Sequence, residues 1–389
     1  MLHNSSHYLD INHDFYLTGA IQKAFDSCSD EGTIFFPPGK YKVTESIHIA
    51  SGILSILGVG SQSMILWASN SDLFVFSNAV GLSTFSDFSI ASVAPVKDIS
   101  IAAFRFINDL TKSEFRQLLF WGRPTLSGQE GVDFPSCIDM GVVSDTIAVT
   151  DSVAWGIVGT AVKIGKGSEV RIIGGRLIGA ENSKGIGIHL TGNNGGVHVV
   201  STDVIGLHEG IRIEDSTGVG SNREVFISQG TIDSNYVGLA LYDNSYVDVS
   251  GLWFASSIRD NIWVSAESNG AILSLTGGTI FNGGAIDGDC GGSECNGITV
   301  NGGTFSLVGV HIRNNRGRGI WIPNGNVKRY VISGCKIYSN GQGLNLQGES
   351  FVVSGNVISD NSERSNFGSS NAGSVVATNV CLDADAGAC

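Results

Sequence analysis

A repeat of apolar residues constrains this fold more than any other feature of the sequence. Its most regular column recurs at intervals of 21 to 32 residues and contains Leu177, Val204, Ile232, Phe254, Ile280, Ile312, Ile337 and Ile358. The residues five and seven positions before each of these are also apolar or aromatic. Since residues two apart in a strand face the same side, each repeat predicts a strand with one apolar face. One repeat cannot bury that face alone, so the repeats must stack on one another.

A second strand follows in all but the last of these repeats, with inward pairs Ile188/Leu190, Ile211/Ile213, Leu239/Leu241, Ile262/Val264, Ile298/Val300, Ile320/Ile322 and Leu344/Leu346. Glycine usually precedes this strand and asparagine stands at several corners: Gly210, Gly238, Gly297, Gly319, Gly343, Asn235, Asn315, Asn340 and Asn361. We expect both residue types to supply the left-handed backbone that a sharp corner needs. The repeat is too short for β-α-β units, so the sequence predicts an all-β fold, a single right-handed parallel β-helix.

The N-terminal third is less regular but compatible with the same fold. We expect strands within residues 33–43, 53–57, 64–67, 73–76 and 85–90. Before them, the apolar spacing predicts a short amphipathic helix over residues 18–29, with Thr18 as its N-cap. This capping helix would cover the open end of the solenoid. We therefore expect an extension over residues 1–17, the helix-capped β-helix over 18–361, and a tail of loop and strand over 362–389.

The composition excludes several classes of function. The formal net charge is −13 and the pI is about 5.0, whereas a nucleic-acid-binding protein needs a basic surface. No 18-residue apolar stretch is present, so we expect no membrane insertion. The sequence contains no P-loop, zinc motif or Ser-His-Asp order, and we expect neither a cofactor nor a metal.

The seven cysteines are too few for a dense disulfide framework in a chain of this length. Cys290 lies close to Cys295 in one Gly-rich loop, and Cys381 lies close to Cys389. Each pair could form a local disulfide or remain as free thiols.

Two segments near the N-terminus resemble the pectate-lyase-like β-helix superfamily. Residues 20–26 (AIQKAFD) and 32–41 (GTIFFPPGKY) are similar to its capping helix and to the strand and turn that follow, and residues 53–60 resemble its next coil. The resemblance implies a polysaccharide as partner, because the superfamily includes pectate lyases, polygalacturonase-type hydrolases, epimerases, fructotransferases and bacteriophage tailspikes.

Within this superfamily, the lack of a secretory signal favours a phage tailspike-like receptor-binding depolymerase. Such a protein would be a homotrimer on a virion tail or outside the cell, and would bind and cleave a bacterial capsule or O-antigen. A secreted bacterial lyase, hydrolase or glycan transferase and a non-catalytic adhesin or structural spike are the alternatives.

Residues that alternate with the inward columns face outward, and any function must come from them. Trp253, Trp263 and Trp321 fall in outward columns, one of which begins with His189. Aromatic faces stack on sugar rings, although a loop or a neighbouring subunit could cover them instead. The predicted substrate-binding residues are Trp253, Trp263, Trp321, Tyr242, Arg212, His311, Arg313, Asp287 and Asp289.

Three carboxylates near these rings are the candidate catalytic residues. Glu209 and Asp260 occupy the same place in their coils, and Asp233 projects from a strand between them. Glycoside hydrolysis uses two carboxylates about 5 to 9 Å apart, which residues one or two coils apart can satisfy at a strand spacing of about 4.8 Å. The alternative is that these outward carboxylates are simply solvated.

Two further charged groups leave alternatives open. Asp287, Asp289 and Glu294 lie in the longest insertion, which could line a substrate site, bind calcium or be a plain loop, and it lacks the rest of an EF-hand. His311, Arg313, Arg316 and Arg318 fall in one coil, where they could bind uronic acids for a lyase or pair with nearby carboxylates.

Overall fold

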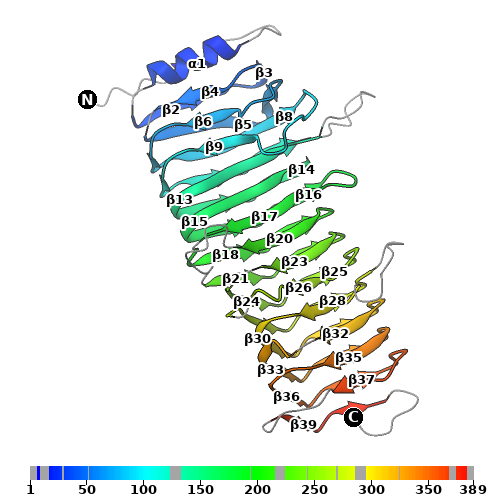
Figure 1. Cartoon of the computed structure of the whole chain (residues 1–389). Helices are drawn as coiled ribbons and strands as arrows, with labels where there is room; N and C mark the ends of the chain where they lie inside the picture. Colours follow the sequence, from blue (N-terminus) through cyan, green and yellow to red (C-terminus); the bar gives the residue numbers. More distant parts are fainter. Residues whose placement is uncertain are drawn as a thin grey trace. The chain divides into compact units, whose positions relative to one another are not determined.

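The computed structural model confirms the predicted fold class. It describes residues 7–8, 17–28, 30–50, 52–122, 133–192, 194–214, 224–242, 244–268, 270–284, 295–323, 325–367 and 374–382, with residues 7–8 and 142 described by their backbone alone. This part of the chain is nearly all β, a parallel β-solenoid with one short helix near its N-terminus (Figure 1). It divides into two compact units, residues 1–191 with 196–198 (unit 1) and residues 192–195 with 199–389 (unit 2).

Unit 1 is a stack of parallel coils that begins with the helix α1 (Thr18–Ser27). Its strands are β1 (His7–Tyr8), β2 (Gly32–Phe35), β3 (Gly39–Val43), β4 (Ile47–Ile49), β5 (Leu54–Trp67), β6 (Phe74–Phe76), β7 (Val80–Gly81), β8 (Thr84–Ser92), β9 (Ala102–Phe106), β10 (Leu110–Thr111), β11 (Glu114–Arg116), β12 (Leu119–Trp121), β13 (Ser136–Thr150), β14 (Val153–Ile157), β15 (Thr160–Ile173), β16 (Arg176–Gly179) and β17 (Ile186–Thr191). The residues of β18 (Val197–Val200) are shared between the two units.

Unit 2 repeats the same coil with shorter strands. They are β19 (Asp203–Ile205), β20 (Glu209–Glu214), β21 (Val225–Ser228), β22 (Thr231–Asp233), β23 (Val237–Leu241), β24 (Tyr246–Ser250), β25 (Trp253–Ala255), β26 (Ile262–Val264), β27 (Ile272–Thr276), β28 (Thr279–Phe281), β29 (Ile298–Val300), β30 (Gly303–Val308), β31 (His311–Arg313), β32 (Arg318–Ile322), β33 (Val327–Ser333), β34 (Lys336–Tyr338), β35 (Gln342–Leu346), β36 (Ser350–Ser354), β37 (Val357–Ser359), β38 (Asn366–Phe367), β39 (Val375–Ala377) and β40 (Val380–Cys381).

The apolar columns form the cores of the units, as the repeat predicts. Every residue of the predicted inward columns is buried. In unit 2 the main column is one continuous ladder, in which Ile232, Phe254, Ile280, Ile312, Ile337 and Ile358 pair in turn. The core of unit 1 is more aromatic, with stacked rings in the pairs Phe76–Phe106 and Phe85–Phe115 at 4.5 and 4.8 Å. Stacking of like residues therefore buries the face that a single coil would expose.

The coil corners depart from the prediction in how glycine and asparagine act. Gly210 and Gly319 lack the left-handed conformation; instead, an added Cβ would lie 2.5 to 2.6 Å from a carbonyl oxygen of the next coil. The left-handed residues are those that precede the asparagines, such as Ser339 at φ 56°. The buried asparagines stack, and Asn340 Nδ2 donates to Asn361 Oδ1 at 3.0 Å. Glycine thus provides space, and asparagine satisfies buried corner carbonyls.

The helix α1 begins at Thr18, as predicted, but Thr18 does not cap it. The N-cap residue is Leu17, without a side-chain capping bond. Thr18 Oγ1 instead accepts a hydrogen bond of 2.9 Å from Thr44 N, and Gln22 bonds to both backbone polar groups of His48. The helix therefore covers the first coil by binding its edge. The expected segments 53–57 and 64–67 are parts of one long strand, β5.

The ladders continue into the C-terminal segment, where β38, β39 and β40 pair with β35, β36 and β37. Cys295 and Cys381 each take part in a disulfide, whereas Cys28, Cys137 and Cys335 are free thiols. Cys290 and Cys389 lie outside the described residues. In the described ranges, no helix combines the length and the apolar character that crossing a membrane requires.

Candidate functional site

A cluster of carboxylates, a guanidinium and aromatic rings forms beside an outward column of unit 2, and Glu209 in it is only 3% exposed. Arg212 on β20 pairs in register with Ala240 on β23, which pairs with Trp263 on β26. The Arg212 guanidinium bridges two carboxylates, with Nη1 3.2 Å from Glu209 Oε2 and Nη2 2.6 Å from Glu214 Oε2. All three residues lie on β20, so one strand supplies both carboxylates and the guanidinium between them.

Tyr242 links the charged part of the cluster to its aromatic part. Its hydroxyl donates a hydrogen bond to Glu209 Oε1, while its ring lies 4.5 Å from the Arg212 guanidinium carbon and 5.1 Å from the ring of Trp263. Burial, the hydrogen bond to Glu209 and that carboxylate's charge raise the pKa of Tyr242 well above its usual range. We call Glu209, Arg212, Glu214, Tyr242 and Trp263 the Glu209 cluster.

The electrostatics of Arg212 follow from its two partners. Burial alone would lower the pKa of its guanidinium, but the hydrogen bond to Glu214 and the charges of both carboxylates outweigh burial, so the pKa of Arg212 is raised. Arg212 therefore stays cationic, and the Glu209 cluster combines two carboxylate oxygen pairs with one fixed positive charge.

The outward column continues with a second tryptophan. Trp263 pairs with Thr299, which pairs with Trp321 on β32, so the two indoles are two strand spacings apart, roughly 10 Å. The Arg318 guanidinium lies 4.7 Å over the Trp321 ring. Both indoles are half-buried, as expected for rings that pack at their base and leave part of their surface open.

A separate aromatic group lies on the neighbouring outward columns of unit 2. Trp253 is 39% exposed, and its ring meets that of Phe281 edge-on at 4.7 Å. Arg313 lies 4.7 Å over Phe281, and His311 is exposed on β31. Arg313 and Arg318 thus cover two different rings, Phe281 and Trp321.

The structure corrects the expected position of Asp260. Its register does match that of Glu209, two coils away. Glu209 pairs with Val237, and the pairing of Leu239 with Ile262 places Asp260 opposite Val237. Both carboxylates are buried, Glu209 at 3% and Asp260 at 2% exposed, but their partners differ: Asp260 Oδ1 accepts a hydrogen bond of 2.7 Å from Asn296 N. Asp260 therefore bonds to the backbone at a coil corner, whereas Glu209 bonds to the side chains of Tyr242 and Arg212.

The other predicted acids lie elsewhere. Asp233 is half-buried at the end of β22, where its Oδ1 accepts a hydrogen bond of 2.9 Å from Ser234 Oγ. The second carboxylate of the Glu209 cluster is Glu214, which is not among the residues predicted from the sequence. Asp287 and Asp289 lie outside the described residues.

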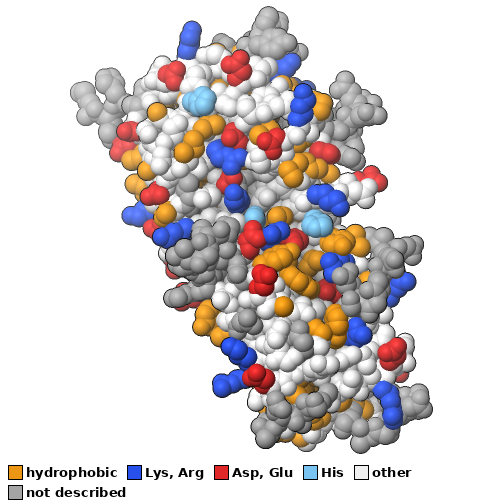
Figure 2. Space-filling model, viewed as in Figure 1, with side chains coloured by type: hydrophobic (Ala, Val, Ile, Leu, Met, Phe, Trp, Pro, Cys, Tyr) orange, Lys and Arg blue, Asp and Glu red, His pale blue; other side chains and the backbone are white. Residues whose placement is uncertain are grey.

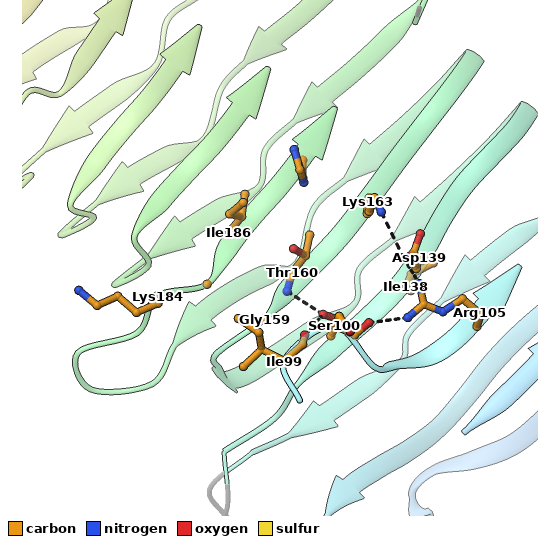
Figure 3. Close-up of a pocket in the computed structure, with 13 residues that line it drawn as sticks. Ile99, Ser100, Arg105, Ile138, Asp139, Gly159, Thr160, Lys163, Lys184 and Ile186 are labelled. Atoms are coloured by element: carbon orange, nitrogen blue, oxygen red, sulfur yellow. Dashed lines mark hydrogen bonds and ion pairs between the residues drawn. The ribbon is translucent and has the colours of Figure 1, made fainter. Parts of the chain in front are cut away.

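A groove in unit 1 was not predicted. A volume of about 330 Å³ is lined by 13 residues, among them Arg105, Asp139, Lys163, Lys184 and His189 (Figure 3). Four of these form a ladder across β9, β13, β15 and β17, in which Arg105 pairs with Asp139, Asp139 with Lys163, and Lys163 with His189. We call this site the unit-1 groove.

Asp139 is the centre of the ion pairs in the unit-1 groove. It is 7% exposed, binds Arg105 through Oδ2 and accepts a hydrogen bond of 2.8 Å from Gly141 N. Lys163 Nζ lies 3.6 Å from the same Oδ2. Arg105 also contacts Asp72 at 3.0 Å. Burial alone would lower the pKa of Arg105, but the interactions with Asp72 and Asp139 outweigh burial and raise it.

One signal in the sequence could have found this groove. His189 is the first residue of an outward column in the regular repeat, and following that column back by one coil at a time reaches Lys163, Asp139 and Arg105. The coils of the N-terminal third are longer and less regular, so the pairing of these strands could not be read from the sequence repeat. Figure 2 shows that Lys and Arg side chains are interspersed with Asp and Glu side chains on the displayed face.

Comparison with solved structures supports the fold. The Azotobacter vinelandii mannuronan C-5 epimerase AlgE6 A-module aligns over 95% of this chain and 95% of its own, with 12% identity and a TM-score of 0.56. PfbA, a surface adhesin of Streptococcus pneumoniae, aligns over 90% and 89%, with 14% identity and a TM-score of 0.50. At these identities the likeness shows the fold alone.

A phage protein is also similar, but more distantly. ORF18 of Geobacillus virus E2 aligns over 91% of this chain and 55% of its own, with 15% identity and a TM-score of 0.39, which is too low to bear on the chain's role. No protein-family model and no curated protein matches the sequence.

Proposed function

We propose that this chain binds a bacterial surface polysaccharide, a capsule or O-antigen, along the outward column of unit 2 and cleaves it hydrolytically. The observation that carries the proposal is the column itself, in which Arg212 is followed by the two indoles of Trp263 and Trp321. Tyr242 packs beside Arg212 and Trp263, and the Arg318 guanidinium lies over Trp321. Aromatic rings offer apolar faces to sugar rings, and the neighbouring carboxylates and guanidinium offer partners to hydroxyl groups.

Hydrolysis is assigned to the carboxylates of the Glu209 cluster. Since Arg212 bridges them, the bonded oxygens of Glu209 and Glu214 lie at most about 8 Å apart, which is compatible with the roughly 5 to 9.5 Å that separates paired carboxylates in glycosidases. Glu209 accepts from both a phenol and a guanidinium, which suits an anion that acts as base or nucleophile. Glu214 would be the acid, and must first be released from Arg212 by the bound sugar. Asp233 remains a second candidate.

The biological setting is proposed on the resemblance near the N-terminus. A tailspike-like receptor-binding protein would act as a homotrimer on a virion tail or otherwise outside the cell. Light scattering coupled to size-exclusion chromatography tests the trimer, since a monomeric mass for the full chain would contradict it.

The reaction is tested on a panel of capsular and O-antigen glycans, with one assay for reducing ends and one for unsaturated uronates. We expect new reducing ends without unsaturated products, and a loss of at least about 100-fold in rate for Glu209→Gln, the scale of an acid–base contribution. Glu349→Gln, at an exposed glutamate of the same unit, is the matched control. Full activity in Glu209→Gln, or unsaturated products, would refute the assignment.

A non-catalytic adhesin or spike is the second candidate, and one observation favours it. Arg212 holds both carboxylates of the Glu209 cluster, so neither is ready to donate a proton. In that case the full chain binds a glycan of the panel with no product, and Trp263→Ala weakens binding while Trp155→Ala, at a 46% exposed indole of unit 1, does not.

A further inference from the structure

The lining of the unit-1 groove contains more cationic than anionic side chains. The whole chain carries a formal net charge of −13, whereas the residues that line the groove include Arg105, Lys163 and Lys184 against one carboxylate, Asp139. A local surplus of positive charge in a concave site raises the local concentration of anions. Asp72, Asp98 and Asp139 neutralise Arg105, so the positive charge that can attract an anion is that of Lys163 and Lys184.

The contacts within the groove decide which cations can receive a ligand. Arg105 is committed, because its guanidinium binds Asp72, Asp139 and the carbonyl oxygen of Ser100. Lys163 is held less tightly. Its Nζ lies 3.6 Å from Asp139 Oδ2, beyond normal hydrogen-bond distance, and its side chain is 35% exposed. The Lys163 ammonium can thus keep its ion pair and still donate to a ligand.

Lys184 supplies the second available charge from a different element. It is exposed on the loop before β17, and in the view of Figure 3 Thr160 and Ile186 lie between it and Lys163. In Figure 3 the Lys184 side chain extends away from the other labelled residues, which places its ammonium at the rim of the groove. The lining between this loop and Lys163 combines an apolar side chain, Ile186, with a hydroxyl-bearing one, Thr160. This mixture matches a sugar ring, which has apolar faces and polar edges.

We infer that the unit-1 groove binds an acidic sugar residue, a glycan unit that bears a carboxylate or sulfate group. Lys163 is the residue that binds its anionic group, Lys184 adds positive charge at the rim of the groove, and the Arg105–Asp139 pair positions Lys163. The inference rests on the proposed function in that the ligand is a glycan, but it concerns different residues in a different unit. It also makes the polysaccharide an acidic one, which the Glu209 cluster by itself does not require.

The test is isothermal titration calorimetry of the full chain with oligogalacturonate, a sulfated dextran oligosaccharide and a neutral dextran oligosaccharide of equal length. We expect one of the two anionic ligands to bind, with an affinity that falls as salt rises, because exposed ion pairs are screened. The two anionic arms distinguish a carboxylate from a sulfate. Binding of the neutral ligand alone, or equal affinity for all three, would overturn the inference.

Variants locate the binding. Lys163→Met/Lys184→Met should weaken anionic binding by about tenfold or more, the equivalent of ~1.4 kcal/mol. Lys23→Met/Lys40→Met removes the same charge from exposed lysines of unit 1 that do not line the groove, and should leave the affinity unchanged. Lys163→Arg, which keeps the positive charge, should retain most of the affinity that Lys163→Met loses. Equal losses in both double variants would show a general charge effect and would overturn the site.

The two proposals fail differently. Suppose that anionic ligands bind and depend on Lys163 and Lys184, but Trp263→Ala and Glu209→Gln have no effect on binding or cleavage of any glycan. The groove then stands and the proposed function of the Glu209 cluster falls. If binding and cleavage depend on Trp263 and Glu209 but not on the two lysines, the reverse holds.

Discussion

Replacing Tyr242 by phenylalanine tests the geometry of the Glu209 cluster most directly. The substitution keeps the ring that packs on Arg212 and Trp263 and removes only the hydroxyl that donates to Glu209. Glu209 is 3% exposed, so water cannot readily replace the lost donor. A hydrogen bond to a charged group contributes about 1.5 to 3 kcal/mol, and we expect the free energy of unfolding to fall by about 2 kcal/mol.

The assay is chemical unfolding followed by tryptophan fluorescence, with Tyr246→Phe as the matched control. Tyr246 is in the coil after Tyr242, is 49% exposed, and should tolerate the same change within about 0.5 kcal/mol. The double variant Tyr242→Phe/Glu209→Gln measures the coupling, which should exceed about 0.5 kcal/mol for directly bonded groups. If Tyr242→Phe costs no more than Tyr246→Phe, or the coupling is zero, the bond on which the cluster depends is absent.

The same variant changes how stability depends on pH. Burial and the bond to Glu209 raise the pKa of Tyr242 above its ordinary value of 10.0, so above pH 10 the unfolded chain loses a proton that the folded chain keeps. The stabilisation is therefore complete below pH 10 and is lost as the pH rises through the raised value. We expect the free energy of unfolding to fall more steeply above pH 10 in the parent protein than in Tyr242→Phe. Parallel slopes would contradict this.

The remaining predictions concern the fold. Ile312→Ala in the central ladder should cost about 2 to 5 kcal/mol of unfolding free energy, measured by denaturant titration, because it opens a cavity between two coils, whereas Val331→Ala at a 39% exposed position should cost under about 1 kcal/mol. Asn340→Ala should cost about 2 kcal/mol or more by the same titration, since it leaves buried corner groups without partners; a neutral result would show that water satisfies them. In native protein, mass spectrometry after alkylation at pH 8 should find Cys28 modified before Cys335, whose burial raises the pKa of its thiol and restricts access; the opposite order would contradict the described burial.

The sequence predicts the fold well because every coil of a solenoid repeats the same pattern of inward and outward residues. Whether Ile312 or Val353 faces inward depends only on the alternation of side chains along a strand, which is a local property. Its stacking partner is the residue one period away, so the ladder of the core follows from aligning the chain on itself. The outward placement of Trp253, Trp263 and Trp321 follows from the same alternation, and the short helix follows from its own apolar spacing.

The tertiary structure decided what each outward or corner position does. Glu209 and Asp260 take equivalent places in their coils, but Glu209 meets Tyr242 and Arg212 while Asp260 meets the backbone of Asn296. The difference arises from the neighbouring coils, whose lengths and insertions vary, and no pattern within one coil reports it. The unit-1 groove was missed for the same reason: Arg105, Asp139 and Lys163 are 24 or more residues apart and become neighbours only through the register of their strands. Periodicity therefore determined which side chains face out, and cross-coil packing, which sets burial and charge partners, decided which of them form sites.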